Sequence, residues 1–199
     1  MSASVRRQRE LRARITAARE LASDPDLSRA IAVGREVLVD CERVLGVDHP
    51  DTLVARNNLA SACHSAGQPA EAIPLFQQNL AHYERLRGAD DPRTLGSRNN
   101  LAGAYQSAGR VAEAISLLEL TLDSCGRVLG ADDPRLLGSR SNLALAYQSA
   151  GRVAEAVPLF ERTLADRERV LGADHRDTVA TRSNLAELGA AQKADDPEA

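Results

Sequence analysis

The chain has 199 residues, of which 43% are hydrophobic and 27% charged, and its formal net charge is −3. This balance is typical of a folded protein and argues against a general nucleic-acid binder, which would be clearly basic. Three cysteines without CxxC spacing argue against a disulfide framework, and no apolar run predicts a membrane span or a secretory signal, so we expect a cytoplasmic protein.

The first predicted element is an arginine-rich helix from about Val5 to Ala22. A second helix is predicted over residues 27–45, because Ala30-Ile31 lies 42 residues before Ala72-Ile73 in a segment that recurs further along the chain. An atypical, polar first unit is what the end of a repeat array requires. Residues 1–45 are therefore expected to form a degenerate N-terminal capping repeat.

From residue 46 onward the sequence repeats itself every 42 residues. Full copies cover residues 46–87, 88–129 and 130–171, and a half copy covers 172–190. One landmark is a Gly-x-Asp connector that begins at Gly46, Gly88, Gly130 and Gly172. A second landmark, Arg-Asn/Ser-Asn-Leu-Ala, begins at Arg56, Arg98, Arg140 and Arg182. Four copies in one register indicate an array of a single structural unit.

Each copy predicts two helices, as the copy over 130–171 illustrates. Asp133 is a suitable N-cap, and Pro134 occupies the first helical position, where its missing N–H costs nothing. Apolar residues then follow at helical spacing until Gly151, a residue type suited to ending a helix. A second amphipathic helix is predicted from about Val153 to Gly172.

The C-terminal part predicts a first helix, from Asp177 to about Ala190, with no second helix after it. Residues 191–199 are expected to be a disordered tail. The whole pattern predicts an all-α fold of about nine antiparallel helices, arranged over 1–190 as one α-α superhelix, or solenoid.

Two segments carry a family resemblance. Asn-Leu-Ala-x-x-Tyr occurs at 100–105 and 142–147, and Gly-Arg-x-x-Glu-Ala follows at 109–114 and 151–156. Together they resemble the tetratricopeptide repeat. The 42-residue period and the connector over 127–134 are similar to the kinesin-light-chain type of that repeat. The resemblance implies a protein-interaction module, and bacterial relatives often form arms of larger regulators.

Stacked helix pairs place their first helices on a concave side, and each first helix then turns a polar face into the groove. The candidate groove residues are Asn57, Asn99, Ser141 and Ser183, with His64, Gln106 and Gln148 further along and Asn58, Asn100 and Asn142 at the border. Amides donate and accept hydrogen bonds, so they can hold the backbone of an extended peptide. Alternatively, the asparagines bridge neighbouring helices within the array.

The arginine ladder of Arg56, Arg98 and Arg140, continued by Arg182, also has two interpretations. These side chains could grip acidic residues of a partner, and we count the first three among the candidate binding residues. They could instead pair with Asp or Glu of the adjacent repeat. The chain has 28 acidic residues that can serve as ion-pair partners, which favours pairing within the chain.

No sequence motif predicts catalysis, a metal or a cofactor. HExxH, a Cys/His cluster with metal-ligand spacing and GxxxxGK[ST] do not occur. His49 and His175 fall at equivalent connector positions, where capping is the ordinary role. The basic run over 6–14 could contact nucleic acid or anionic lipid, but Glu10 interrupts it, and a solvated capping helix is favoured.

The predicted function is therefore a non-enzymatic module that binds a peptide or partner protein in its groove. One alternative is an arm or fragment of a larger signalling or transcriptional regulator. Another is a homodimeric scaffold that associates through the C-terminal helix, because Val179, Leu185 and Leu188 of this helix have no second helix to cover them.

Overall fold

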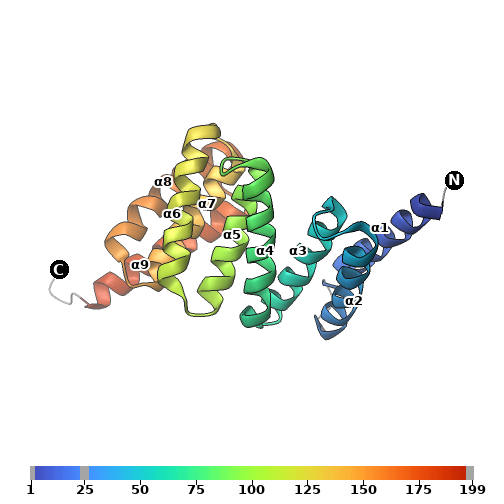
Figure 1. Ribbon diagram of the computed structural model, residues 1–199. Coiled ribbons are helices and arrows are strands. Elements are labelled where there is room, and N and C mark those ends of the chain that lie inside the picture. The colour runs from blue at the N-terminus through green and yellow to red at the C-terminus, as the bar shows by residue number, and fades with distance from the viewer. Residues whose placement is uncertain (1–2, 23–26, 196–199) are drawn as a thin grey trace. The chain divides into compact units, whose positions relative to one another are not determined.

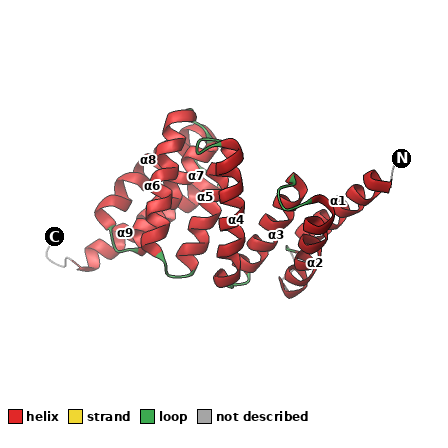
Figure 2. Cartoon of the chain, viewed as in Figure 1, coloured by secondary structure: helices red, strands yellow, loops and turns green. Residues whose placement is uncertain are grey.

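The computed structural model describes residues 3–22 and 27–195, which form helices joined by short turns (Figures 1 and 2). The nine helices within these ranges are α1 Ala3–Leu21, α2 Leu27–Leu45, α3 Pro50–Ser65, α4 Pro69–Arg87, α5 Pro92–Ser107, α6 Val111–Val128, α7 Pro134–Ser149, α8 Val153–Leu171 and α9 Arg176–Asp195. This confirms the predicted all-α class. None of the described helices is long and apolar enough to cross a membrane.

The chain divides into two compact units. Unit 1, Met1–Ala108, contains α1 to α5, and unit 2, Gly109–Ala199, contains α6 to α9. Within each unit, every helix packs on the next helix along the chain. In unit 1 the first helices are also neighbours, since α1 packs on α3 and α3 packs on α5. This second set of contacts positions the candidate site described below.

The first helices of the repeats begin with the predicted capping pattern, with one variation. At α7 the Asp133 carboxylate accepts a hydrogen bond from the Arg135 backbone N–H at 2.8 Å, and Pro134 is the first helical residue. At α3 and α9 a connector histidine replaces the aspartate. His49 Nδ1 accepts from the backbone N–H of Asp51 at 3.1 Å, and His175 does the same for Asp177. A side-chain acceptor therefore caps each of these helices.

The core is built from small and aliphatic side chains that repeat with the 42-residue period. Ala60, Ala102 and Ala144 have no exposed surface, nor do Ala72, Ala114 and Ala156 of the second helices. Alanine at these positions lets helix backbones approach closely, while larger residues such as Phe160 and Leu137 fill the space between them. Enlarging any of these alanines would overpack the core.

The C-terminal helix is longer than the sequence suggested. Its helical conformation continues to Asp195, past the boundary expected at residue 190. The remainder of the expected tail, residues 196–199, lies outside the described residues. The alanine-rich sequence over 186–194 explains the extension, because alanine has the highest intrinsic helix propensity.

Candidate functional site

Two asparagines connect neighbouring first helices in unit 1. Asn100 of α5 donates from Nδ2 to Asn57 Oδ1 of α3 at 3.1 Å. Asn57 is half-buried and Asn100 is exposed, so the pair lies at the surface of the α3–α5 contact. The structure thus places both predicted residues together, and it shows that bridging between helices is part of their role.

A pocket of about 260 Å³ adjoins this amide pair. The residues that line it are Ser61, His64, Ser65, Phe76, Asn99, Asn100 and Gly103. His64 Nε2 lies 3.3 Å from Ser107 Oγ across the same helix pair. A Cβ atom at Gly103 would lie 3.4 Å from His64 Cε1, so glycine at this position keeps the space beside His64 open.

Asn99 and Gln106 complete the predicted residues of α5. Asn99 Nδ2 donates to the Leu95 backbone carbonyl at 3.2 Å, one turn back along its own helix. Asn99 still lines the pocket. Gln106 is half-buried near the end of α5. Asn57 with Asn100, and His64 with Ser107, join the two helices.

Asn58 lies in a different environment from Asn57. It lines a small hollow between α1, α2 and α3, together with Ile15, Ala30 and Val37. Its Nδ2 is buried and has no hydrogen-bond partner. Asn58 and Asn100 occupy equivalent positions that face the preceding first helix. Asn100 meets Asn57 there, whereas Asn58 meets Ile15, which stands 42 residues before Asn57 and offers no amide.

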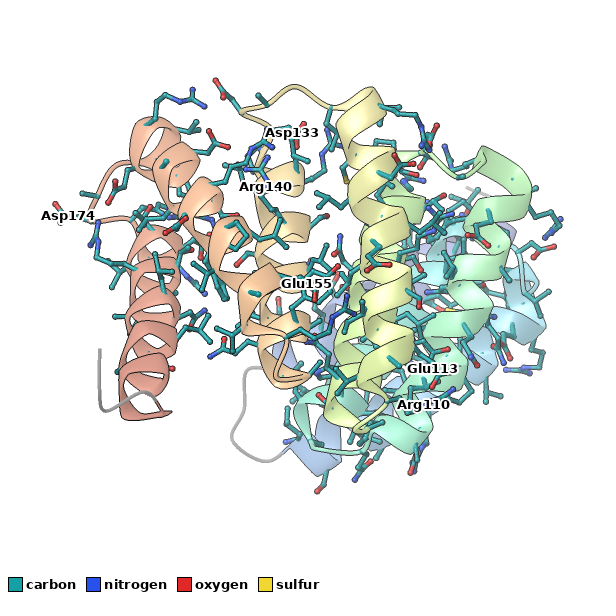
Figure 3. All side chains as sticks on the ribbon, turned by 90° about the vertical axis from the view of Figure 1, so that its left-hand side faces the viewer. Arg110, Glu113, Asp133, Arg140, Glu155 and Asp174 are labelled. Carbon is teal, nitrogen blue, oxygen red and sulfur yellow. The ribbon has the colours of Figure 1, made fainter. Side chains whose placement is uncertain are left out.

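The arginine ladder is buried and paired within the chain. Arg56, Arg98 and Arg140 are 4%, 3% and 4% exposed. Arg56 pairs with Glu42 at 2.8 Å and Arg98 with Glu84 at 2.7 Å, each on the preceding second helix. Arg140 pairs with Asp166 at 2.6 Å, between α7 and α8 (Figure 3). These contacts correspond to the structural alternative, so the three arginines do not enter the binding site proposed below.

The predicted residues of unit 2 lie in several environments. Ser141 is buried and lies 3.4 Å from the Arg167 guanidinium. Asn142 and Gln148 are half-buried on α7, and Ser183 is exposed on α9. In this unit serine occupies the register of Asn57, at 141 and 183, whereas asparagine keeps the register of Asn100, at 142 and 184.

A larger pocket of about 690 Å³ in unit 1 was not predicted from the sequence. Its lining includes Val54 of α3, Tyr83, Leu86 and Arg87 of α4, and Arg93 of α5. Val54 and Leu86 are 46% and 57% exposed. One feature of the sequence could have indicated this pocket. Leu86 is an aliphatic residue at the end of a second helix, in register with Val44 and Val128, and all three are exposed. Exposed aliphatics that recur with the period mark this edge of the repeat.

The tyrosines of the repeat signature link a first helix to the preceding second helix. In unit 1 the Tyr105 hydroxyl accepts from Gln77 Nε2 at 3.0 Å. In unit 2 the Tyr147 hydroxyl donates to Glu119 Oε1 at 2.7 Å, and the Arg152 guanidinium lies 4.4 Å from the ring centre. Burial, together with the Glu119 carboxylate, raises the pKa of Tyr147 to about 12. These tyrosines are structural rather than free to contact a ligand.

Among the described residues, no group of three or more His, Cys, Asp or Glu side chains is arranged to hold a metal ion. Two connector acids, Asp48 and Asp132, instead pair with Arg85 and Arg169 of second helices, at 3.0 and 2.6 Å. Arg110 and Glu113 pair in the same local way at the start of α6 (Figure 3). These charged pairs therefore serve helix ends and connectors.

Comparison with known proteins gives a consistent assignment. Models of the tetratricopeptide repeat match residues 26–85, 57–126, 93–152 and 136–177. Two crystal structures of nearly identical TPR-like repeats, from a Podosopora anserina protein assigned as a kinesin light chain, share 30% and 31% identity with the chain. Their TM-scores are 0.81 and 0.79, and each match covers 98% of this chain and 90% of the other.

A crystal structure of BtubC (BKLC) from P. vanneervenii is similar in fold, with a TM-score of 0.70 at 19% identity over 94% of this chain and 84% of that one. No curated protein sequence matches the chain. Tetratricopeptide repeats are generally protein–protein interaction modules and generally not enzymes. The predicted solenoid class is confirmed, and the chain belongs to the tetratricopeptide repeat family, with repeats like those of kinesin light chains.

Proposed function

We propose that the chain binds an extended segment of a partner protein on the α3–α5 face, defined here as Asn57, Ser61, His64, Asn99 and Asn100. The observation that carries this proposal is the Asn57–Asn100 amide pair beside the 260 Å³ pocket. The remaining predicted residues are not part of this face. Arg56, Arg98 and Arg140 are engaged in ion pairs, and Asn58 faces α1.

The amide pair keeps unused hydrogen-bonding groups. The bond between the two side chains uses one N–H of Asn100 and the carbonyl of Asn57. The Asn57 amino group can therefore donate to a peptide carbonyl, and the Asn100 carbonyl can accept from a peptide N–H. An extended peptide presents both groups along its backbone, so this pair suits backbone recognition without demanding a particular sequence.

The adjoining pocket can accept one side chain of the bound segment. Its floor includes Phe76, which is almost fully buried, and its rim carries His64 and Ser61. Glycine at 103 keeps the pocket open next to His64. A pocket of this size suits a small or medium side chain with apolar character.

The test is affinity capture from the native organism with the full chain as bait. Asn57→Ala/Asn100→Ala should lower recovery of the captured partner by roughly tenfold, because two backbone hydrogen bonds are lost. Gln78→Ala is the matched control, since Gln78 is an exposed amide on α4 away from this face. Recovery by the double variant equal to that by wild type, with an unchanged circular dichroism spectrum, would count against this site.

A further inference from the structure

The C-terminal helix exposes a face that is covered in the other first helices. Val179 of α9 is equivalent to Leu53 of α3 and Leu137 of α7, which lie 126 and 42 residues earlier. Leu53 and Leu137 are 3% and 1% exposed, whereas Val179 is 48% exposed. Ala186 is likewise exposed, although its equivalents Ala60 and Ala144 are fully buried.

The contacts of α3 show what normally lies on this face. Asn79 of α4 donates from Nδ2 to the Leu53 backbone carbonyl at 3.0 Å, and Asn57 and His64 contact α5. The equivalent residues of α9 are Val179, Ser183 and Ala190. The uncovered face of α9 is therefore a helix-packing face by its position in the repeat.

The residues of this face form a continuous seam along the described part of α9. Val179, Ser183, Ala186 and Ala190 follow one another at intervals of four, three and four residues, and all four are exposed. This spacing is the heptad pattern of helices that pack side by side. Thr181 and Leu188 lie on the opposite side of the helix and are buried. The small side chains of the seam allow close approach of another helix.

Two opposite charges flank the seam on one side. Arg176 has a side chain that is 91% exposed, and its one ion-pair contact is with the adjacent Asp177 at 3.5 Å. Glu187 is exposed and lies three turns further along the same flank. In an antiparallel pair of identical helices related by a two-fold axis, the same flanks face each other. An axis near residues 182 and 183 brings Val179 onto Ala186 of the second copy, and Arg176 next to its Glu187.

We infer that α9 is an isologous dimer interface, in which two copies of this chain pack their α9 seams antiparallel. Two Val179–Ala186 contacts form the apolar centre, and two reciprocal Arg176–Glu187 pairs fix the register. The occupant is a second copy because the flank that carries Arg176 and Glu187 is self-complementary: each of these two charges meets its opposite when the helix is paired with itself. Arg182, near the axis on the other flank, keeps its ion pair with Glu168 at 2.7 Å. This interface lies apart from the α3–α5 face proposed for partner binding.

The test is sedimentation equilibrium of the full chain over a range of concentrations. Wild type should show a reversible monomer–dimer equilibrium. Arg176→Glu and Glu187→Arg should each weaken the dimer by about tenfold. Each substitution turns both reciprocal Arg176–Glu187 pairs of the interface into pairs of like charge. The double variant Arg176→Glu/Glu187→Arg should restore the dimer. These residues are exposed, so the variants should keep the wild-type circular dichroism spectrum.

Arg162→Glu serves as the matched control, because Arg162 is an exposed arginine elsewhere in unit 2, on α8, and its reversal should leave the dimer unchanged. Val179→Glu should abolish the dimer by placing a charge at the apolar centre. A chain that stays monomeric at every concentration overturns the proposal. A dimer that none of the α9 variants weakens, or that the double variant fails to restore, overturns it as well.

Discussion

At the scale of single residues, two repeats contain the same Arg–Glu ion pair, but the two pairs differ in burial. Arg56 pairs with Glu42 through a guanidinium whose side chain is 5% exposed. Arg182 makes the equivalent pair with Glu168 at 2.7 Å, but its side chain is 47% exposed. The geometry is the same and the burial differs, because a second helix follows α3 and none follows α9 within the described residues. Burial should therefore decide how much each pair contributes.

Glu42→Ala should lower the free energy of unfolding by about 2 kcal/mol, because it leaves the Arg56 charge buried without its carboxylate. Glu168→Ala should change it by no more than about 0.5 kcal/mol, since Arg182 becomes solvated instead. Urea denaturation followed by circular dichroism measures both values. Equal losses in the two variants would show that burial does not set the strength of this pair.

Tyr147 is a second single residue with a clear effect, because its contribution to the stability of the folded protein depends on pH. Its pKa is raised to about 12 in the folded protein, first by burial and then by the hydrogen bond to Glu119. An unfolded tyrosine ionises near pH 10, at about its ordinary pKa. The raised pKa means that the stabilising contribution is complete below about pH 10 and is lost as the pH rises toward about 12.

Tyr147→Phe should therefore be less stable than wild type at about pH 8, because phenylalanine cannot make the hydrogen bond to Glu119. The difference should shrink or reverse at about pH 11, because the unfolded wild-type chain gains stability by ionising Tyr147 and the variant does not. Urea titrations of both proteins at the two pH values give the comparison. A difference that stays constant between them would contradict the raised pKa.

At the scale of elements, we expect α9 to be attached to unit 2 less securely than the helices before it, because of one buried arginine. Arg167 of α8 is buried at a position held by Cys41, Tyr83 and Cys125 in the other repeats. It donates to Ser141, to Thr181 and to the Asp177 backbone carbonyl, and its Nε has no partner. Desolvation lowers the pKa of this arginine. A buried cation without a carboxylate partner destabilises the α8–α9 contact.

Amide hydrogens of α9 should consequently exchange faster than those of α7, measured by mass spectrometry at dilute protein concentration so that self-association does not contribute. Arg167→Met should slow exchange in α9, since methionine fills the site without a desolvated charge. Exchange in α3 is the internal reference, because this helix lies in unit 1. Faster α9 exchange in Arg167→Met would show that the arginine hydrogen bonds hold the helix.

The sequence allowed each helix to be placed but not its neighbours to be identified. Capping residues and the glycines after each helix predicted the boundaries, as Asp133, Pro134 and Val153 illustrate. Which side of a first helix faces the next one depends on packing between helices, and single-helix periodicity does not contain that information. Asn57 and Asn58 were therefore both predicted for the groove, one on its face and one at its border, although one meets Asn100 and the other meets Ile15.

At the scale of the whole molecule, the 42-residue period predicted the family and the class of function, because four copies in one register leave few alternative folds. The candidate site was predicted only in part. The amide positions of α3 and α5 were found, but the arginine ladder proved to be buried, and the 690 Å³ pocket was missed because its lining comes from three helices. Residues that no single helix brings together are visible only in the folded chain.

The central claim is that a partner protein binds on the α3–α5 face, and site-specific cross-linking tests it most directly. A photoreactive residue at Ser61, which lines the 260 Å³ pocket, should cross-link a partner protein in the native organism. The cross-link should disappear in Asn57→Ala/Asn100→Ala, and a photoreactive residue at Gln78 should not capture the same protein. Equal cross-linking from Ser61 and Gln78, unaffected by the double substitution, would contradict the account.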